Sequence, residues 1–356
     1  MKQVSESGAA KAAPPSGAAT SASGYGPFVR LRWQAWEQMA KDRLDDDARR
    51  RFDGRLECWE LRVSGPPFAA AGAADLVVPV ARRDGSGAVL KLNPDDEEVR
   101  HEDVALRAFD GDGAVRLLES DRDSRALLLE RLTPGTPLEA HGDSDEAITI
   151  VCGLLRRLWR AAPVEHQLPA ASELARRLRG ELPARYERAG RPFEQGLFDA
   201  ALAACEELGH PAGKEIIANR DIHLGNVLAA QREPWLLIDP QPVLGEPAFD
   251  LAYLAQDLLP RHPRAADLGA VLDRLTGELE VSPERVRLWM LVREVDNTLE
   301  GMGRGAQWGS RHLAIARLLA EAPRRGIRHE HHRAPAASSS DQAGSDLVLG
   351  ERSQQQ

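Results

Sequence analysis

Two apolar segments of the chain each end on an acidic residue, and the residues at these ends could carry chemistry. Residues 216–226 read IIANRDIHLGN, so that a strand-like run leads into Asp221 and then Asn226. Shortly afterwards, WLLIDP repeats the pattern and ends on Asp239. Oxygen atoms of carboxylates and amides are the ligands that Mg²⁺ prefers. The two segments therefore predict a site for phosphoryl transfer from ATP, in which Mg²⁺ is held against the phosphates.

The types and spacing of these residues indicate separate roles. Asp221-x-x-x-x-Asn226 has the spacing of a kinase catalytic loop, in which the aspartate accepts the proton of the attacking hydroxyl. Asn226 and Asp239 would bind Mg²⁺. His223 could instead be the general base, but phosphoryl transfer depends mainly on positioning and charge, so we expect it to support the loop. Asp250, an acid at the start of the next helix, is also expected to be structural.

A lysine in an apolar strand, Lys91 in AVLKL, is costly to bury unless it has a partner. On the predicted helix that follows, Glu102 shares a face with Leu106 and Phe109, so its carboxylate also needs a partner. Pairing of Lys91 with Glu102 would form the ion pair with which kinases hold the phosphates of ATP. In the alternative, Lys91 extends to solvent and Glu102 lies at the edge of the apolar stripe.

The elements that must position these residues differ between the two parts of the chain. Residues 26–132 contain two hairpin patterns, one of them turning at DGSG, which predicts a small antiparallel sheet. TPGTP at 133–137 predicts a hinge, and residues 133–326 are mainly helical, with helices expected at about 171–188 and 194–208. The pattern predicts an α+β fold.

The composition limits the classes of partner. The formal net charge of −9 argues against a general nucleic-acid-binding protein, which would present a basic face. No apolar run approaches the length of a membrane span. Three cysteines with apolar neighbours and no metal-binding spacing predict reduced core residues of a cytoplasmic protein. Segments 1–25 and 327–356, the second with an HEHH cluster, have the composition of disordered tails.

Four segments together resemble the aminoglycoside and hydroxyurea phosphotransferases, and specifically the streptomycin 6-phosphotransferase branch. They are NRDIHLGNVL, PWLLIDPQPVLGEPAFDLAYL, VPVARRDGSGAVLKL and HEDVALRAFDGDGAVRLL, within about residues 55–305. The resemblance implies a two-lobed protein-kinase-like fold, with ATP between a sheet-rich N-terminal lobe and a helical C-terminal lobe. By matching position, the resemblance implies that Asp221 is the catalytic base and that Asn226 and Asp239 bind Mg²⁺. It also implies that Lys91 contacts the phosphates and that Glu102 is the partner of Lys91.

The chain departs from the family pattern at the start of the catalytic loop. The family usually has His-Gly-Asp there, and this chain has Asn219-Arg220-Asp221, so the ring is lost while the ability to form hydrogen bonds is kept. The chain also differs from protein kinases, because Pro240-Gln241 follows Asp239 where a protein kinase has Phe-Gly.

A streptomycin-like substrate carries guanidinium groups, so the resemblance implies carboxylates near the catalytic aspartate. On the predicted helix LVREVDNTLEG, Asp296 and Glu300 share a face and Glu294 faces another way. These three acids are the candidate substrate contacts. In the alternative, the helix surface is solvated and compensates its own charges, with Arg293 beside Asp296.

These patterns predict a kinase that uses ATP and Mg²⁺ to phosphorylate a hydroxyl of a streptomycin-like aminoglycoside, which would inactivate the antibiotic and confer resistance. The expected partner is a small, hydroxylated, cationic molecule, with no nucleic acid and no membrane. Two alternatives remain open. One is a kinase of another small hydroxylated compound such as hydroxyurea. The other is a catalytically weak, kinase-like regulatory module that binds nucleotide.

Overall fold

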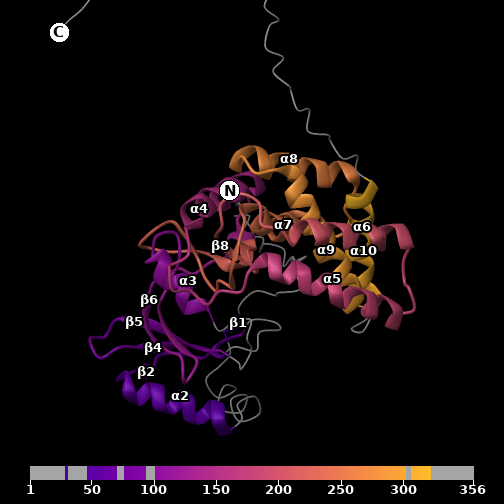
Figure 1. Cartoon of the computed structure of the whole chain (residues 1–356). Coiled ribbons are helices and arrows are strands. Elements are labelled where there is room, and N and C mark those ends of the chain that lie inside the picture. Colours follow the sequence, from indigo (N-terminus) through magenta and orange to yellow (C-terminus); the bar gives the residue numbers. More distant parts are fainter. Residues whose placement is uncertain (1–28, 31–45, 70–75, 94–100, 302–305, 322–356) are drawn as a thin grey trace, which may run out of the picture. The chain divides into compact units, whose positions relative to one another are not determined.

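The computed structural model describes residues 29–30, 46–69, 76–93, 101–301 and 306–321. The chain divides into two compact units, Met1–Pro323 and Arg324–Gln356, and every described residue belongs to the first. In that unit the sheet precedes most of the helices along the chain, as an α+β fold requires (Figure 1). The predicted tails, with the HEHH cluster, lie outside the described residues, and the predicted lobe boundaries remain predictions.

The described strands of the first part form one antiparallel sheet. Its order is β1 (Val29–Arg30), β3 (Phe68–Ala69), β4 (Leu76–Ala81), β5 (Gly87–Leu92), β7 (Ala126–Glu130) and β6 (Leu117–Asp121), with β2 (Arg62–Val63) also paired to β4. The two predicted hairpins are β4–β5 and β6–β7. Lys91 lies opposite Val77 on β4 and Leu127 on β7, so its strand has a neighbour on both sides.

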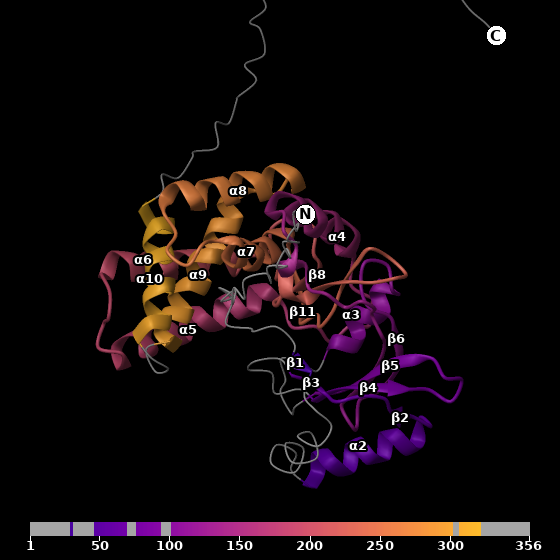
Figure 2. The same ribbon diagram turned by 180° about the vertical axis from the view of Figure 1, so that it is seen from behind.

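The alternation of side chains along these strands separates two hydrophobic cores. Leu90 and Leu128 lie on one face of the sheet and pack with Phe52 of α2 (Asp46–Cys58) in a small core. Figure 2 shows α2 along the side of the sheet that faces away from the other helices. The next residues along the strands point to the opposite face, where Leu127 joins the large helical core. Lys91 is opposite Leu127 and therefore points toward the helical part.

The other described helices are α3 (Glu102–Phe109), α4 (Ser144–Leu158), α5 (Ala171–Arg188), α6 (Gln195–Leu208), α7 (Pro247–Leu258), α8 (Ala265–Leu279), α9 (Pro283–Gly301) and α10 (Ala306–Glu321). The helices predicted at 171–188 and 194–208 are α5 and α6. Helix α9 packs against α5, α6, α7, α8 and α10, so it lies at the centre of the helical part. Its sequence explains this position, because apolar residues occur on more than one of its faces.

Four short strands and two short 3₁₀ helices complete the described part of the chain. They are η2 (Leu138–Ala140), β8 (Ile216–Asn219), η3 (Leu224–Asn226), β9 (Val227–Ala229), β10 (Trp235–Leu237) and β11 (Pro242–Gly245). β8 pairs with β11 and β9 pairs with β10, both antiparallel.

The cysteines agree only partly with the prediction of a buried, reduced set. All three are free; Cys152 on α4 and Cys205 on α6 are buried. Cys58, however, is exposed, so its prediction as a core residue was wrong. It ends α2, and a helical rotation of about 100° per residue places it about 120° around the helix from the buried Phe52.

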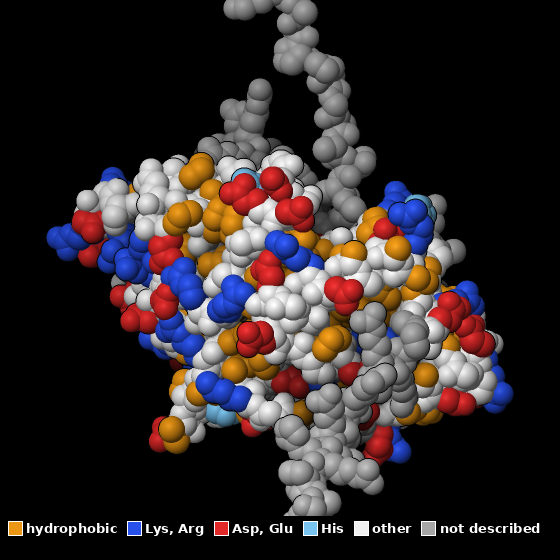
Figure 3. Space-filling model, turned by 90° about the horizontal axis from the view of Figure 1, so that it is seen from above, with side chains coloured by type: hydrophobic (Ala, Val, Ile, Leu, Met, Phe, Trp, Pro, Cys, Tyr) orange, Lys and Arg blue, Asp and Glu red, His pale blue; other side chains and the backbone are white. Residues whose placement is uncertain are grey.

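On the face shown in Figure 3, acidic side chains lie among the basic ones. No helix within the described ranges is both long enough and apolar enough to span a membrane.

Candidate active site

One hairpin brings together two of the predicted Mg²⁺ ligands. Asn226 directly precedes β9, and Ile238 directly follows β10, its partner strand. The amide N–H of Ile238 donates to the carbonyl oxygen of Asn226 at 2.8 Å. Asp239 follows with a φ of 53°, a left-handed conformation that aspartate tolerates better than most residues and that ends the extended chain. Asn226 and Asp239 therefore lie at the same end of the hairpin.

Lys91 joins the sheet to α3 through Glu102 and to this hairpin through Asp239. Its Nζ donates to Oε2 of Glu102 at 2.8 Å and to Oδ1 of Asp239 at 2.5 Å. Lys91 and Glu102 are 3% and 2% exposed, so Lys91 does not extend to solvent. Asn93 adds a hydrogen bond from Nδ2 to Oε2 of Glu102 at 3.1 Å. The predicted pair is therefore buried, and it includes Asp239 as a third member.

The catalytic-loop residues contact one another directly. Asn226 donates from Nδ2 to Oδ2 of Asp221 at 3.0 Å and to the Asp221 carbonyl oxygen at 3.1 Å. His223 accepts from the amide of Gly225 through Nδ1 at 3.1 Å, while its Nε2 is 3.8 Å from Oδ2 of Asp221. A methyl group on Gly225 would come within 2.9 Å of the ring, so glycine leaves the space that the ring needs. These contacts favour a supporting role for His223.

The electrostatics of the site act mainly through burial. Burial raises the pKa of Glu102 to about 7, although the charge of Lys91 acts to lower it. Burial also raises the pKa of Asp221, while the charges of His223 and Arg293 act to lower it. A carboxylate with a raised pKa is a stronger base, as acceptance of a hydroxyl proton requires.

Asn219, which replaces the usual histidine, organises the catalytic loop. Its Oδ1 accepts from the amides of Asp221 and Gln241, both at 2.9 Å, so one oxygen joins the segments that follow β8 and Asp239. Asp250 in turn binds the backbone of Asn219, because its Oδ1 accepts from that amide at 2.6 Å. The other oxygen of Asp250 accepts from Nε1 of Trp159 at 2.9 Å. Apart from the contact with Asp221, these contacts link residues 22 or more positions apart, so spacing alone did not reveal them.

The buried Asp250 predicts a pH-dependent effect on stability. Burial raises its pKa to about 7, against the two hydrogen bonds that lower it. A raised pKa means that Asp250 contributes stability fully below the unfolded value, near 3.8, and loses it as pH rises through about 7. Asp250→Asn removes this titration. The free energy of unfolding is measured in urea at pH 5 and pH 8 for both proteins. We expect the value of the variant relative to that of the wild type to be higher at pH 8 than at pH 5 by about 1 kcal/mol or more. A difference independent of pH would contradict the assignment.

The structure separates the three acids predicted to contact a cationic substrate. Glu294 is 0% exposed and its Oε2 is 2.6 Å from Nδ1 of His312, so the prediction that it contacts substrate is corrected: it lies inside the helical core. The physical reason is the central position of α9, which buries this face against α10. Asp296 is partly exposed and pairs with Arg185 of α5. Glu300 is exposed, and it remains a candidate together with Asp296.

Arg293 does not neutralise Asp296, as the alternative interpretation of α9 proposed. Its guanidinium carbon lies 3.5 Å from the ring centroid of Tyr253 on α7. Its positive charge also acts to lower the pKa of Asp221, against the larger effect of burial. The sequence pattern did not identify Arg293 or Tyr253 as residues of this region, because the stacking joins two helices far apart in the chain.

The donor set fits Mg²⁺ bound together with phosphates. Within the described ranges, no group of three or more His, Cys, Asp or Glu side chains could hold a metal ion alone. Mg²⁺ does not need such a group, since it commonly takes one or two carboxylates and completes its shell with phosphates and water. Asn226 and Asp239 supply two hard oxygen donors at one end of a hairpin. The Asn226 amide nitrogen donates to Asp221, so its oxygen is the atom that would bind the ion.

The sheet, its buried lysine and the facing Asp221–Asn226 loop define a protein-kinase-like phosphotransferase. Solved structures agree on the fold. The chain is similar to the aminoglycoside phosphotransferase APH(4)-Ia, with a TM-score of 0.52 at 13% identity, covering 78% of this chain and 100% of that one. It is also similar to the choline kinase LicA from Streptococcus pneumoniae, with a TM-score of 0.52 at 12% identity, covering 76% and 97%. At these identities the likeness shows the fold alone.

The family is defined by sequence. Residues 59–300 match the family described as aminoglycoside/hydroxyurea antibiotic resistance kinase, and the chain belongs to that family. It is 42% identical over 271 residues to a hydroxyurea phosphotransferase of Kitasatospora aureofaciens, covering 74% of this chain and 76% of the relative. It is 38% identical over 272 residues to a streptomycin 6-kinase of Streptomyces griseus, covering 75% and 87%. The predicted family, fold and class of enzyme are thereby confirmed.

Proposed function

We propose that this protein transfers the γ-phosphate of ATP to a hydroxyl of a streptomycin-like aminoglycoside and so inactivates the antibiotic. The observation that carries the proposal is the contact of Lys91 with both Glu102 and Asp239, next to the Asp221–Asn226 pair. These contacts bring together a lysine that could bind phosphate, the carboxylate and amide oxygens of Asp239 and Asn226, and the candidate base Asp221. The residues come from elements far apart in sequence. This is the set that phosphoryl transfer needs.

Each residue has one task in the proposed reaction. Lys91, fixed by Glu102, would bind the phosphates of ATP. Asp221 would orient the acceptor hydroxyl and take its proton as the oxygen attacks the γ-phosphorus, with ADP as the leaving group. Bound through Asn226 and Asp239, Mg²⁺ would supply positive charge against the phosphate oxygens. His223 would hold the loop in place.

The acceptor is proposed from the relatives and from the acids of α9. Streptomycin 6-kinases are among the relatives, and Asp296 and Glu300 on α9 are the acids proposed to bind a guanidinium group. The charge of Asp296 is already partly compensated by Arg185. Hydroxyurea is the second candidate, because a hydroxyurea phosphotransferase is 42% identical to this chain. We place the reaction in the cytoplasm, where ATP is available and free cysteines persist.

An acceptor panel tests the proposed function. The protein is incubated with ATP and Mg²⁺ and with streptomycin, other aminoglycosides or hydroxyurea, each in a separate reaction. ADP release is measured, and products are analysed by mass spectrometry for the addition of one phosphoryl group. We expect ADP release that depends on streptomycin and a singly phosphorylated product. Phosphorylation of hydroxyurea alone would establish the second candidate. Nucleotide binding without turnover for any acceptor would favour the regulatory module.

A further inference from the structure

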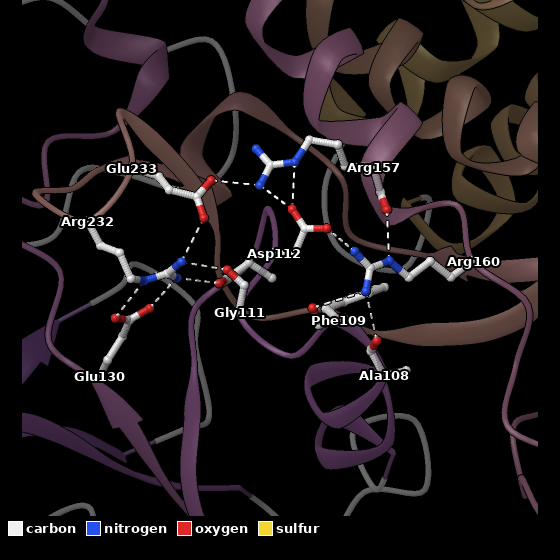
Figure 4. A network of polar contacts seen from close by, with 10 residues as sticks. Ala108, Phe109, Gly111, Asp112, Glu130, Arg157, Arg160, Arg232 and Glu233 are labelled. Carbon is white, nitrogen blue, oxygen red and sulfur yellow. Dashed lines mark hydrogen bonds and ion pairs between the residues drawn. The ribbon is translucent and has the colours of Figure 1, made fainter.

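The loop between β9 and β10 carries Arg232, which is the centre of a network of polar contacts (Figure 4). Its guanidinium binds both carboxylate oxygens of Glu130 at the end of β7, with Nη2 2.6 Å from Oε1 and Nε 3.2 Å from Oε2. It also donates to the carbonyl oxygens of Gly111 at 2.7 Å and Ala114 at 3.0 Å. A further bond from Nη1 to Glu233 at 2.7 Å keeps the side chain against its own loop.

The second half of the network lies at the end of α4. Glu233 accepts from Nη2 of Arg157 at 2.7 Å, and Arg157 binds Asp112 through Nε at 2.8 Å. Arg160 also binds Asp112, and it donates to the carbonyl oxygen of Ala108 at 3.2 Å. Residues 108–114, which leave α3 and lead to β6, are therefore held both from the hairpin and from α4.

Backbone contacts join the same segment to β10. The amide of Leu237 donates to the carbonyl oxygen of Gly113 at 2.9 Å, and the amide of Val115 donates to the carbonyl oxygen of Leu237 at 2.8 Å. Gly111 has a φ of 75°, and a Cβ there would meet Cγ of Arg116 at 2.5 Å. Glycine therefore permits the turn whose carbonyl oxygen receives Arg232.

Burial singles out Arg232 within the network. The Arg232 and Glu130 side chains are 22% and 19% exposed, compared with 41% for Arg157 and 48% for Asp112. Exposed ion pairs contribute little, whereas a two-point arginine–carboxylate contact fixes orientation and is stronger. The contact of Arg232 with Glu130 is thus the one best able to constrain the hairpin.

We propose that Arg232 is a positioning residue for phosphoryl transfer, which holds the β9–β10 hairpin in register with the sheet and α3. Two partners of Arg232, Glu130 and Gly111, lie in or directly after elements that position site residues. Glu130 ends the strand that pairs with the strand of Lys91, and Gly111 follows the helix that begins at Glu102. Arg232 itself lies between the two ligand positions of the hairpin. The inference rests on the roles proposed above for Lys91, Glu102, Asn226 and Asp239.

Two variants test the proposal without removing a site residue. Glu130→Gln keeps the shape of the side chain and an acceptor but removes the charge, and Arg232→Gln removes the two-point contact altogether. We expect Arg232→Gln to raise the KM for ATP·Mg by about 10-fold or more, because small misplacements of catalytic groups are costly. Glu130→Gln should have a smaller effect in the same direction, and the KM for the acceptor should change less than about 2-fold in both.

The control for the loss of an arginine–carboxylate contact elsewhere is Arg317→Gln, whose pair with Glu194 is more exposed. Arg317 on α10 makes a similar two-point contact with Glu194, but it binds neither the hairpin nor residues 108–114. We expect its KM for ATP·Mg to equal that of the wild type. Unchanged KM values in both network variants, with only a lower melting temperature, would overturn the proposal and leave Arg232 with a merely structural role.

Hydrogen exchange separates this inference from the proposed function, because it needs no activity. We expect Arg232→Gln to speed exchange of the Val115 and Leu237 amides by about 10-fold or more, as for a locally loosened segment, and Arg317→Gln to leave it unchanged. Unchanged exchange at both amides would overturn the inference even if the enzyme is active. If the variant exchanges faster but the wild type binds no nucleotide, the proposed function is wrong, while the coupling of the hairpin to the sheet is still supported.

Discussion

Asp221→Ala is expected to lower turnover by about 10²-fold or more while nucleotide binding persists. The variant loses the carboxylate that would accept the acceptor proton, and Lys91 and Asp239 remain in contact with each other. Steady-state ADP release with the accepted substrate measures turnover, and titration with a fluorescent ADP analogue measures binding. Near-normal turnover would show that another group is the base.

His223→Ala is the control that separates the two candidate bases. Its Nε2 lies 3.8 Å from Asp221, and its Nδ1 accepts from the Gly225 amide. If His223 only supports the loop, its loss should cost less than about 10-fold in turnover, which is well below the effect of a missing general base. Losses of equal size in the two variants would instead point to an Asp221–His223 unit.

Glu102→Ala is expected to lower the free energy of unfolding by about 3 kcal/mol, at the lower end of the range for breaking a buried ion pair. The pair is buried, so Lys91 loses a partner that water cannot replace. The loss stays at the lower end because Asp239 still accepts from Nζ of Lys91. Urea unfolding at pH 8, above the raised pKa of Glu102 of about 7, measures the change with the carboxylate ionised.

Glu119→Ala is the matched control for this measurement. Glu119 lies on β6 of the same sheet and is exposed, so its removal should change the free energy of unfolding by less than about 0.5 kcal/mol. A loss below about 1 kcal/mol for Glu102→Ala would mean that the contact with Glu102 adds little once Asp239 is present.

The sequence predicted best what depends on local pattern. Period-two alternation and the turn residues gave the hairpins β4–β5 and β6–β7, and helical spacing placed Glu102 on an inward face. The end of each apolar strand located Asp221 and Asp239. These features need only neighbours along the chain, and the same short-range rules govern the folded protein.

Contacts between elements that are distant in the sequence could not be predicted from local pattern. Glu294 has the spacing of a surface acid, but α9 has helices on several sides and buries it beside His312. Asp296 meets Arg185 and not the nearby Arg293, which turns to Tyr253. In each case the partner lies on another helix, and periodicity within one helix says nothing about which helix that is.

The side-chain amide of Asn219 has a consequence for the range of molecules that the protein could accept. A single side-chain oxygen of Asn219 accepts two N–H groups, one from Asp221, the proposed base, and one from Gln241, two residues after Asp239. One side chain therefore holds these two segments together, and we expect them to move as one unit when a bulky sugar or a much smaller compound binds. The geometry of transfer is then built into the polypeptide, and the shape of the incoming molecule can vary without disturbing it.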